Sequence, residues 1–286
     1  MSNETIVNES ETFGIGEQTV HRLGFGAMRL CGSGIIGPPD DEDGAREVLR
    51  QATDLGVDFI DTADSYGPGV SERLIGEAIG DPEDVLIATK AGLLRNQDSE
   101  WLANGDPDYI RNQVLTSLDR LRTDTIDLYQ FHQPDPETPF EESVQTFADL
   151  KDDGLVRNVG LSNVSVEQLE TAREYVDVAT VQNRYNVADR SSAAVLDVCG
   201  EHGIGFMPWA PIDGDDLDAH GDLLDEIAAD HDATRRQVAL AWHLARSDVV
   251  LPIPGTSDPD HLESNVAASQ LSLSDDEVKR LTGAAD

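Results

Sequence analysis

The sequence predicts an α/β protein folded as a closed (β/α)8 TIM barrel, with an N-terminal hairpin as a cap and an extra helix at the C-terminus. Eight strand and helix units alternate along the 286 residues, and no linker rich in proline, glycine and serine interrupts them. No glycine-rich dinucleotide turn of Rossmann spacing follows any strand. An open, doubly wound sheet is the alternative. A chain of this length can bury a substantial core, and we expect one domain over residues 1–286.

Each element has its own sequence signal. A short apolar and glycine pattern at residues 12–20 indicates the hairpin. Runs of β-branched and aromatic residues mark strands at residues 23–28, 57–61, 85–89, 126–131, 156–161, 179–182, 204–209 and 249–253. Apolar residues at helical spacing predict helices at residues 43–55, 71–79, 108–121, 140–152, 165–175, 190–202, 222–231, 235–245, 259–268 and 274–281. Pro134 and Pro136 keep the loop after the fourth strand from becoming helical too early.

Acidic residues outnumber basic ones by 56 to 20, which gives a formal net charge of −36. Such a field repels nucleic acid and anionic membrane surfaces, so we expect neither as a partner. Lysine occurs only at positions 90, 151 and 279. The composition is typical of a protein that stays soluble where salt screens its self-repulsion, as in the cytoplasm of a salt-accumulating halophile.

The cysteines and the N-terminal stretch favour a reduced, cytoplasmic protein. Cys31 and Cys199 are too few for a disulfide framework and lack metal-ligand spacing, so we interpret them as buried thiols. The polar stretch 1–11 lacks the apolar core of a signal peptide. No segment approaches the roughly 18 to 20 apolar residues needed to cross a bilayer.

Three strands end in residues that carry chemistry. The second strand runs into Asp61, the third into Lys90 and the fourth into His132, and Tyr66 follows Asp61 before a glycine turn. An aspartate that closes a strand is on its own more often a turn former or a helix cap. In a barrel, however, the carboxyl ends of the strands share one face, so we expect these four side chains to meet there.

Together these residues can donate a proton to a carbonyl oxygen. A tyrosine hydroxyl titrates near 10, and an ammonium ~4 Å away, at an effective dielectric of ~20, could lower that pKa by up to ~3. Desolvation opposes part of this effect. Asp61 would keep Lys90 charged, and His132 would orient the carbonyl or share the proton. None of these groups can supply a hydride, which points to a nicotinamide cofactor.

In these residues the chain resembles the aldo-keto reductase family over nearly its whole length. Asp61 and Tyr66 stand in Asp-Thr-Ala-Asp-Ser-Tyr-Gly, Lys90 follows Ala-Thr, and His132 ends Tyr-Gln-Phe-His. The resemblance implies that Tyr66 is the general acid and that Lys90 lowers its pKa. It also implies that Asp61 pairs with Lys90 and that His132 orients the substrate carbonyl.

The resemblance also implies a cofactor site. Ser162 and Asn163 in Gly-Leu-Ser-Asn, with Gln182, match positions that hydrogen-bond the nicotinamide carboxamide. Trp209 takes the place of the aromatic ring that stacks on the nicotinamide, although barrel filling is an alternative role. Pro211 and Ile212, which follow it, are assigned to the same cofactor site. The next loop usually cradles the pyrophosphate, and here it carries the acidic stretch 213–216, which weakens phosphate binding unless the carboxylates point away or cations screen them.

The adenosine end of the cofactor is expected to lie on the last barrel segment and the helix after it. The corresponding residues are Gly255, Thr256, Ser257, His261 and Asn265. A lysine and an arginine that grip the 2′-phosphate in many family members are absent. NADPH is still the expected cofactor on family grounds, with NADH as the alternative, and His261 could make that preference depend on pH.

Other polar and aromatic residues are interpreted as structural. The acidic run 40–43 is expected to be a solvated helix start, and no metal site is expected. Tyr129 and Phe131 are assigned to the core, whereas Trp101 is a candidate lining of the substrate pocket, because loops over a barrel mouth often set specificity. The histidines assigned to the surface or to helix packing are His21, His202, His220, His231 and His243.

The sequence therefore predicts an NADPH-dependent oxidoreductase that reduces small aldehydes or ketones without a metal. A nucleotide-binding regulatory or accessory subunit with little turnover is the second hypothesis, and the complete set of four residues argues against it. A metal-dependent barrel hydrolase or lyase is the third, and the lack of convergent histidines and carboxylates argues against it. No sequence signal specifies an oligomeric state or a particular substrate.

Overall fold

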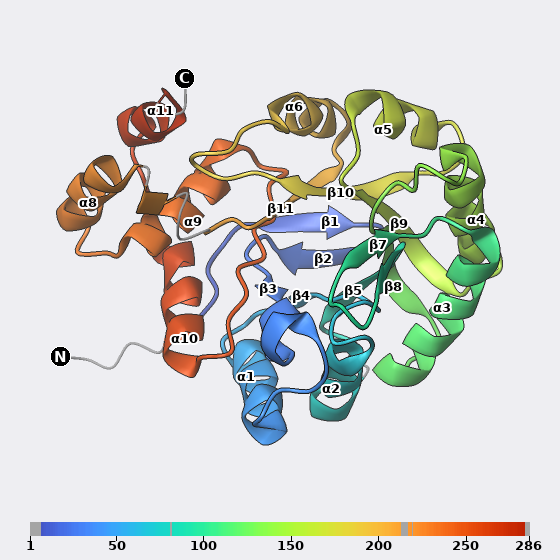
Figure 1. The fold of residues 1–286 in the computed structure, drawn as a ribbon. Helices are drawn as coiled ribbons and strands as arrows, with labels where there is room; N and C mark the ends of the chain where they lie inside the picture. The colour runs from blue at the N-terminus through green and yellow to red at the C-terminus, as the bar shows by residue number, and fades with distance from the viewer. Residues whose placement is uncertain (1–6, 81, 213–216, 219, 284–286) are drawn as a thin grey trace.

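The computed structural model describes residues 7–80, 82–212, 217–218 and 220–283, and it is a (β/α)8 barrel (Figure 1). Seven parallel strands lie side by side in chain order. They are β3 (Phe25–Gly26), β4 (Phe59–Asp61), β5 (Leu86–Ala91), β8 (Ile126–Phe131), β9 (Val156–Ser162), β10 (Val178–Arg184) and β11 (Gly205–Trp209). The prediction of a barrel is confirmed.

Residues 249–253 close the barrel without forming the regular eighth strand that the sequence predicts. On one side the segment forms an isolated bridge with Phe206 of β11, whose N–H donates to the Val249 carbonyl oxygen and whose carbonyl oxygen accepts from the Leu251 N–H, at 2.7 and 2.8 Å. On the other side, the Gly24 and Gly26 N–H groups donate to the carbonyls of Pro252 and Pro254, at 3.0 and 3.2 Å. Prolines at 252 and 254 have no N–H and cannot complete a ladder. The segment therefore joins β11 to β3 through fewer hydrogen bonds than a strand makes.

The first barrel strand is shorter than expected because the chain turns early. After Gly26 it enters two short 3-10 turns, η1 (Ala27–Leu30) and η2 (Ser33–Ile35). Glycine is needed here because the backbones approach closely: a Cβ on Gly26 would lie 2.7 Å from the Ile253 carbonyl oxygen. The tight approach seals β3 against the closing segment.

The N-terminal hairpin caps one end of the barrel, as predicted. Strands β1 (Thr12–Ile15) and β2 (Gln18–His21) pair antiparallel, and Figure 1 shows them within the ring of barrel strands. Buried Ile15 and Val20 pack against the barrel interior. A Cβ on Gly16 would meet Asn158, near the start of β9, so the hairpin covers the amino ends of the strands. The carboxyl ends of the strands, where the catalytic residues are expected, are not covered by this hairpin.

The predicted helices are all present within a few residues and lie around the outside of the barrel (Figure 1). They are α1 (Glu42–Asp54), α2 (Val70–Ala78), α3 (Pro107–Leu121), α4 (Phe140–Asp152), α5 (Val166–Arg173), α6 (Ala193–His202), α8 (Gly221–Asp230), α9 (Arg235–Arg246), α10 (Pro259–Ala267) and α11 (Asp275–Gly283). Ser165 caps α5 in a capping box with Gln168. Within the described ranges, no helix is both long and apolar enough to cross a membrane.

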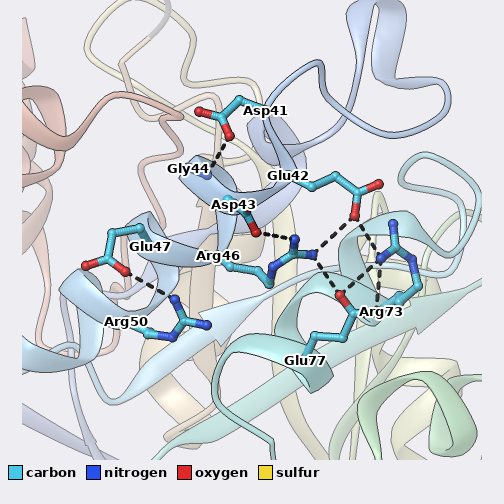
Figure 2. Close-up of polar contacts among 9 residues, drawn as sticks. All are labelled: Asp41, Glu42, Asp43, Gly44, Arg46, Glu47, Arg50, Arg73 and Glu77. Carbon is cyan, nitrogen blue, oxygen red and sulfur yellow. Dashed lines mark hydrogen bonds and ion pairs between the residues drawn. The ribbon is translucent and has the colours of Figure 1, made fainter.

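The acidic run 40–43 leads into α1 and forms its first turn, as expected (Figure 2). The Asp41 carboxylate accepts a hydrogen bond from the Gly44 N–H at 2.8 Å and caps the helix. Glu42 and Asp43 both pair with Arg46, at 3.2 and 2.7 Å. The first turn of α1 is thus occupied by cap and ion-pair contacts.

A second hairpin, which the sequence analysis missed, lies in the long loop after β5. Strands β6 (Leu93–Arg95) and β7 (Trp101–Ala103) pair antiparallel. The turn between them is held by the Asn96 side chain, whose oxygen accepts from the Asp98 and Glu100 N–H groups, each at 3.0 Å. This hairpin follows directly on the strand that carries Lys90.

Candidate active site

Four predicted side chains meet at the carboxyl ends of three neighbouring strands. Asp61 is the last residue of β4, Lys90 lies near the end of β5, and His132 directly follows β8. Tyr66 lies in the loop between β4 and α2. All four are buried, with exposed fractions of 7% or less. Residues up to 71 positions apart in the sequence therefore share one site.

Lys90 is the centre of this site. Its Nζ donates to Asp61 Oδ2 and to the Thr62 carbonyl oxygen, both at 2.7 Å, and to Tyr66 Oη at 3.4 Å. The Tyr66 and His132 rings meet edge to face, with centroids 5.8 Å apart. The Tyr66 hydroxyl thus lies beside the Lys90 ammonium group, and the Tyr66 ring lies against the His132 imidazole.

Burial dominates the electrostatics of the site. It raises the pKa of Tyr66 well above 10, with the Asp61 charge as the next cause, so the acidification expected from Lys90 does not appear in the protein alone. Burial lowers the pKa of Lys90, and Asp61 opposes that shift. Burial and Lys90 together hold the pKa of His132 well below 6.5. His132 is therefore neutral, and its Nδ1 lies 3.4 Å from Ser65 Oγ.

Asp61 is held from both sides. Its second oxygen, Oδ1, accepts from Gln182 Nε2 at 2.9 Å and from Gln130 Nε2 at 3.2 Å. The Gln182 amide, expected to face a carboxamide, thus donates to Asp61 here. Gln130 has no special sequence signal; its place on the strand before His132 was the only clue. With Lys90, the two amides fix the carboxylate rigidly.

Ser162, Asn163 and Trp209 lie together at the ends of β9 and β11. Asn163 Nδ2 donates to the His132 carbonyl oxygen and to Ser162 Oγ, both at 3.1 Å. The Trp209 indole N–H donates to Asn163 Oδ1 at 2.9 Å. Asn163 has a φ of 57°, a left-handed conformation that asparagine tolerates. The ring of Trp209 and the amide of Asn163 are therefore locked beside His132.

Pro211 and Ile212 begin the loop after β11. The Pro211 carbonyl oxygen lies 3.2 Å from Nε2 of His243, which is fully buried and has a pKa lowered to about 3 by that burial. The packing role expected for His243 thus includes holding this loop. The acidic stretch 213–216, expected beside the pyrophosphate, lies outside the described residues.

The predicted adenosine-binding residues follow the closing segment of the barrel. Thr256 Oγ1 accepts from the Asp258 N–H at 3.0 Å, and Ser257 and His261 are exposed. Asn265 lies on α10 and is only 5% exposed. Its side chain has no hydrogen-bond partner in the described part of the chain.

Arg29 is a cation near this segment that the sequence analysis did not identify. A Cβ on Gly255 would lie 3.5 Å from Cγ of Arg29, which follows β3 in the turn η1. Arg29 is exposed and forms no ion pair with any residue that the structure describes. The only available signal was its position just after the first barrel strand.

The β6–β7 hairpin lies against the site. The Trp101 ring meets the Tyr66 ring edge to face at 6.3 Å, and the Arg95 guanidinium stacks 3.7 Å from the Trp101 ring centroid. Arg95 also donates to the carbonyl oxygens of Ile35 and Gly34, at 3.1 and 2.8 Å. The hairpin is thus fastened to the loop after β3, with Trp101 next to the phenol.

The other singled-out residues have structural contacts. His21 lies 2.7 Å from Asp58, and His231 lies 2.9 Å from Glu277. Cys31 and Cys199 are buried and unpaired, as expected. In the described part of the chain, no three His, Cys, Asp or Glu side chains are grouped so that they could hold a metal ion.

Comparison with known proteins agrees with this geometry. The Aldo/keto reductase family model matches residues 22–286. An uncharacterized oxidoreductase of Schizosaccharomyces pombe is 42% identical over 98% of this chain and 92% of its own, and the pyridoxine 4-dehydrogenase of Escherichia coli is 40% identical over 96% and 98%. The crystal structure of a Klebsiella pneumoniae aldo/keto reductase in complex with NADP and acetate superimposes with a TM-score of 0.81, at 28% identity over 95% and 94% of the two chains. The chain therefore belongs to the aldo/keto reductase family of oxidoreductases.

Proposed function

We propose that this protein reduces aldehydes or ketones to alcohols with NADPH, and that Tyr66 donates the proton. The observation that supports this most strongly is the position of Lys90 Nζ, which contacts both Asp61 and the Tyr66 hydroxyl. An ammonium group that is held charged beside a phenol stabilises the phenolate left after proton donation. A purely binding protein needs no such pair.

The side chains have distinct roles in this proposal. A substrate carbonyl oxygen accepts hydrogen bonds from Tyr66 Oη and from neutral His132, which orient it. Bound NADPH supplies the hydride to the carbonyl carbon. As charge develops on the oxygen, the Tyr66 proton moves to it, and Lys90 stabilises the resulting phenolate. Asp61 keeps Lys90 charged and aimed, and the reverse sequence oxidises an alcohol.

The residues present fit a nicotinamide dinucleotide. Asn163, Ser162 and Trp209 offer an amide, a hydroxyl and an aromatic face beside His132. At the other end, Asn265 is 5% exposed, and its amide, which has no hydrogen-bond partner in the described part of the chain, is suited to the edge of an adenine. Arg29 is the cation that we assign to a cofactor phosphate. NADPH is our proposal over NADH, because solved relatives bind NADP or NADPH.

We further propose small aromatic aldehydes as substrates, with pyridoxal as the first to test. A relative with 40% identity over nearly the full length is a pyridoxine 4-dehydrogenase. The Trp101 ring beside Tyr66, with the Arg95 guanidinium stacked on it, suits a flat, polar aromatic ring. The high acidic excess favours a salt-rich cytoplasm as the setting.

Spectrophotometric oxidation of NADPH and of NADH, measured with pyridoxal and a panel of other carbonyl compounds at low and high potassium chloride, tests the proposal. We expect turnover with NADPH, with the highest kcat/KM among aromatic aldehydes. Binding of NADPH with no turnover of any carbonyl compound would instead favour the regulatory subunit.

A further inference from the structure

Asp64 is a buried carboxyl group that the proposed reaction does not use. It lies in the loop that carries Tyr66, two residues before it, and is 4% exposed. Tyr109 Oη donates to its Oδ2 at 2.8 Å, whereas its Oδ1 has no hydrogen-bond partner in the described part of the chain. Among the described residues, the only side chain that is hydrogen-bonded to this carboxyl group is thus the Tyr109 phenol, which carries no charge.

The charges around Asp64 do not balance. Three buried carboxyl groups, on Asp61, Asp64 and Glu72, lie in and behind the active site. Two of these carboxyl groups form ion pairs: Asp61 pairs with Lys90 at 2.7 Å, and Glu72 pairs with Arg120 at 2.9 Å. Asp64 has no ion pair of its own in the described structure. A buried carboxylate without a cation is strongly disfavoured, so this group tends to keep its proton.

Asp64 also connects the parts that surround Tyr66. Its N–H donates to the Lys90 carbonyl oxygen at 3.1 Å, and its carbonyl oxygen accepts from the Gly69 N–H at 2.7 Å. Tyr109 Oη lies 3.2 Å from the Leu93 carbonyl oxygen at the start of the β6–β7 hairpin. The Asp64–Tyr109 pair therefore joins the Tyr66 loop, the Lys90 strand and the hairpin.

We propose that Asp64 is a positioning residue that works as a neutral carboxylic acid, and that its ionisation slows proton donation by Tyr66. When Tyr66 gives up its proton it becomes an anion. A second negative charge two residues away disfavours that anion, whereas a neutral carboxylic acid does not. The proposal rests on the proposed role of Tyr66 in carbonyl reduction.

The electrostatics of the cluster agree with this role. Burial, followed by the charge of Glu72, raises the pKa of Asp64 to about 8, and the Tyr109 hydrogen bond lowers it. The charge of Asp64 is in turn one of the causes that raise the pKa of Tyr66. The titratable and charged groups that face Asp64 are Tyr66, Glu72, Lys90, Tyr109, Arg120 and Tyr129.

The pH profile of reduction tests the proposal, with an aldehyde that has no ionisable group of its own. We expect kcat/KM of the wild type to fall by about tenfold as the pH rises through about 8 and Asp64 loses its proton, and to level off once Asp64 is fully ionised. Asp64→Asn should abolish this decline, because its amide stays neutral. Tyr109→Phe should move the decline to higher pH, because it removes the hydrogen bond that stabilises the carboxylate. Asp98→Asn, at an exposed position in the hairpin turn, should leave the profile unchanged.

Infrared difference spectroscopy tests the proton on Asp64 without requiring any reductase activity. The wild type should show the carbonyl stretch of a protonated carboxylic acid at pH 7, which disappears as the pH rises through about 8 and is absent from Asp64→Asn. If Asp64→Asn does not fold, the pH titration of this band in the wild type and its shift in Tyr109→Phe decide the question. No protonated band at pH 7, or the same decline in rate with Asp64→Asn, would overturn the proposal.

Discussion

The lysine at the end of β5 has the most demanding position in the molecule. Lys90 is fully buried, and its ammonium is satisfied by Asp61, the Thr62 carbonyl and the Tyr66 hydroxyl. Ions are rarely buried unless a paired charge and hydrogen bonds compensate for lost hydration. Lys90 is one of only three lysines in the chain, and both its burial and its partners fit a role in catalysis.

Removing the Lys90 ammonium should damage both stability and activity. In Lys90→Met, Asp61 is left buried without a cation, so we expect the free energy of unfolding to fall by about 3–5 kcal/mol. Residual reduction should also be slower, with any alkaline decline moved to higher pH, because without the ammonium group the pKa of Tyr66 rises and it becomes a weaker proton donor. Denaturant titration and pH profiles measure the two effects.

The double variant Lys90→Met with Asp61→Asn separates the loss of stability from the loss of activity. It leaves no uncompensated carboxylate, so stability should partly return while the reductase activity stays low. Recovery of activity together with stability would mean that Lys90 serves only the fold.

Arg29 gives a second prediction, on the cofactor. Replacing it with glutamine should raise the Kd for NADPH about tenfold, since a hydrogen bond to a charged group contributes about 1.5–3 kcal/mol. The equivalent change at exposed Arg122, at the end of α3, is the control and should not alter the Kd. Quenching of intrinsic tryptophan fluorescence reports the binding. An unchanged Kd in Arg29→Gln would remove Arg29 from the phosphate site.

At the scale of single residues, the sequence predicted the catalytic residues at the strand ends. It did not predict the neighbouring side chains that hold them in place. Asp61, Lys90 and His132 each follow an apolar run, and barrel topology then brings them together. Asp64 looked like an ordinary loop residue, because its lack of a cation depends on where Glu72 and Arg120 pack. The hydrogen bond from Gln182 to Asp61 is likewise a packing result.

Among the elements, the β6–β7 hairpin has the most direct connection with specificity. It is fastened to the loop after β3 by Arg95 and places Trp101 against Tyr66. Trp101 is 42% exposed, which is unusual for so large an apolar residue. An aromatic substrate would cover part of this ring.

We therefore expect Trp101→Ala to raise KM for pyridoxal roughly tenfold, which is equivalent to about 1.4 kcal/mol of lost aromatic contact. The KM for a short aliphatic aldehyde should change less, and kcat should change little for either. Steady-state kinetics with both substrates measure this difference. Equal effects on the two substrates would argue for a general loosening of the hairpin instead.

The elements that the sequence predicted poorly are those governed by local turn chemistry. Helices with clear apolar periodicity, such as α3 and α9, begin within a residue of their expected positions. The closing segment has the composition of a strand, but Pro252 and Pro254 deprive it of donors. The β6–β7 hairpin has strands of only three residues each, too short for a periodic pattern to stand out.

On the scale of the whole molecule, the charge distribution combines strong self-repulsion with local pairing. The net charge is −36, yet Arg46 and Arg73 each contact two or more carboxylates between α1 and α2 (Figure 2). Surface pairs of this kind contribute little individually. The excess of unpaired carboxylates should therefore dominate the response to salt.

We expect the thermal unfolding midpoint to rise by several degrees between about 0.1 and 1 M potassium chloride, because the Debye length falls from about 10 to 3 Å. An equal osmolality of a neutral osmolyte is the control, and calorimetry measures both. A midpoint that falls with potassium chloride would mean that ion pairs outweigh the repulsion. A single transition would also support the proposal that residues 1–286 form one domain.

The central claim, that the Tyr66 hydroxyl donates the proton to a carbonyl oxygen, is tested most directly by Tyr66→Phe. This variant removes only that oxygen and keeps the ring contacts with Trp101 and His132. We predict that kcat/KM for aldehyde reduction falls about 10²–10⁴-fold, while the Kd for NADPH, measured by fluorescence on the same preparation, stays within twofold of the wild type (a difference of about 0.4 kcal/mol). Reduction at the wild-type rate by Tyr66→Phe would contradict the account.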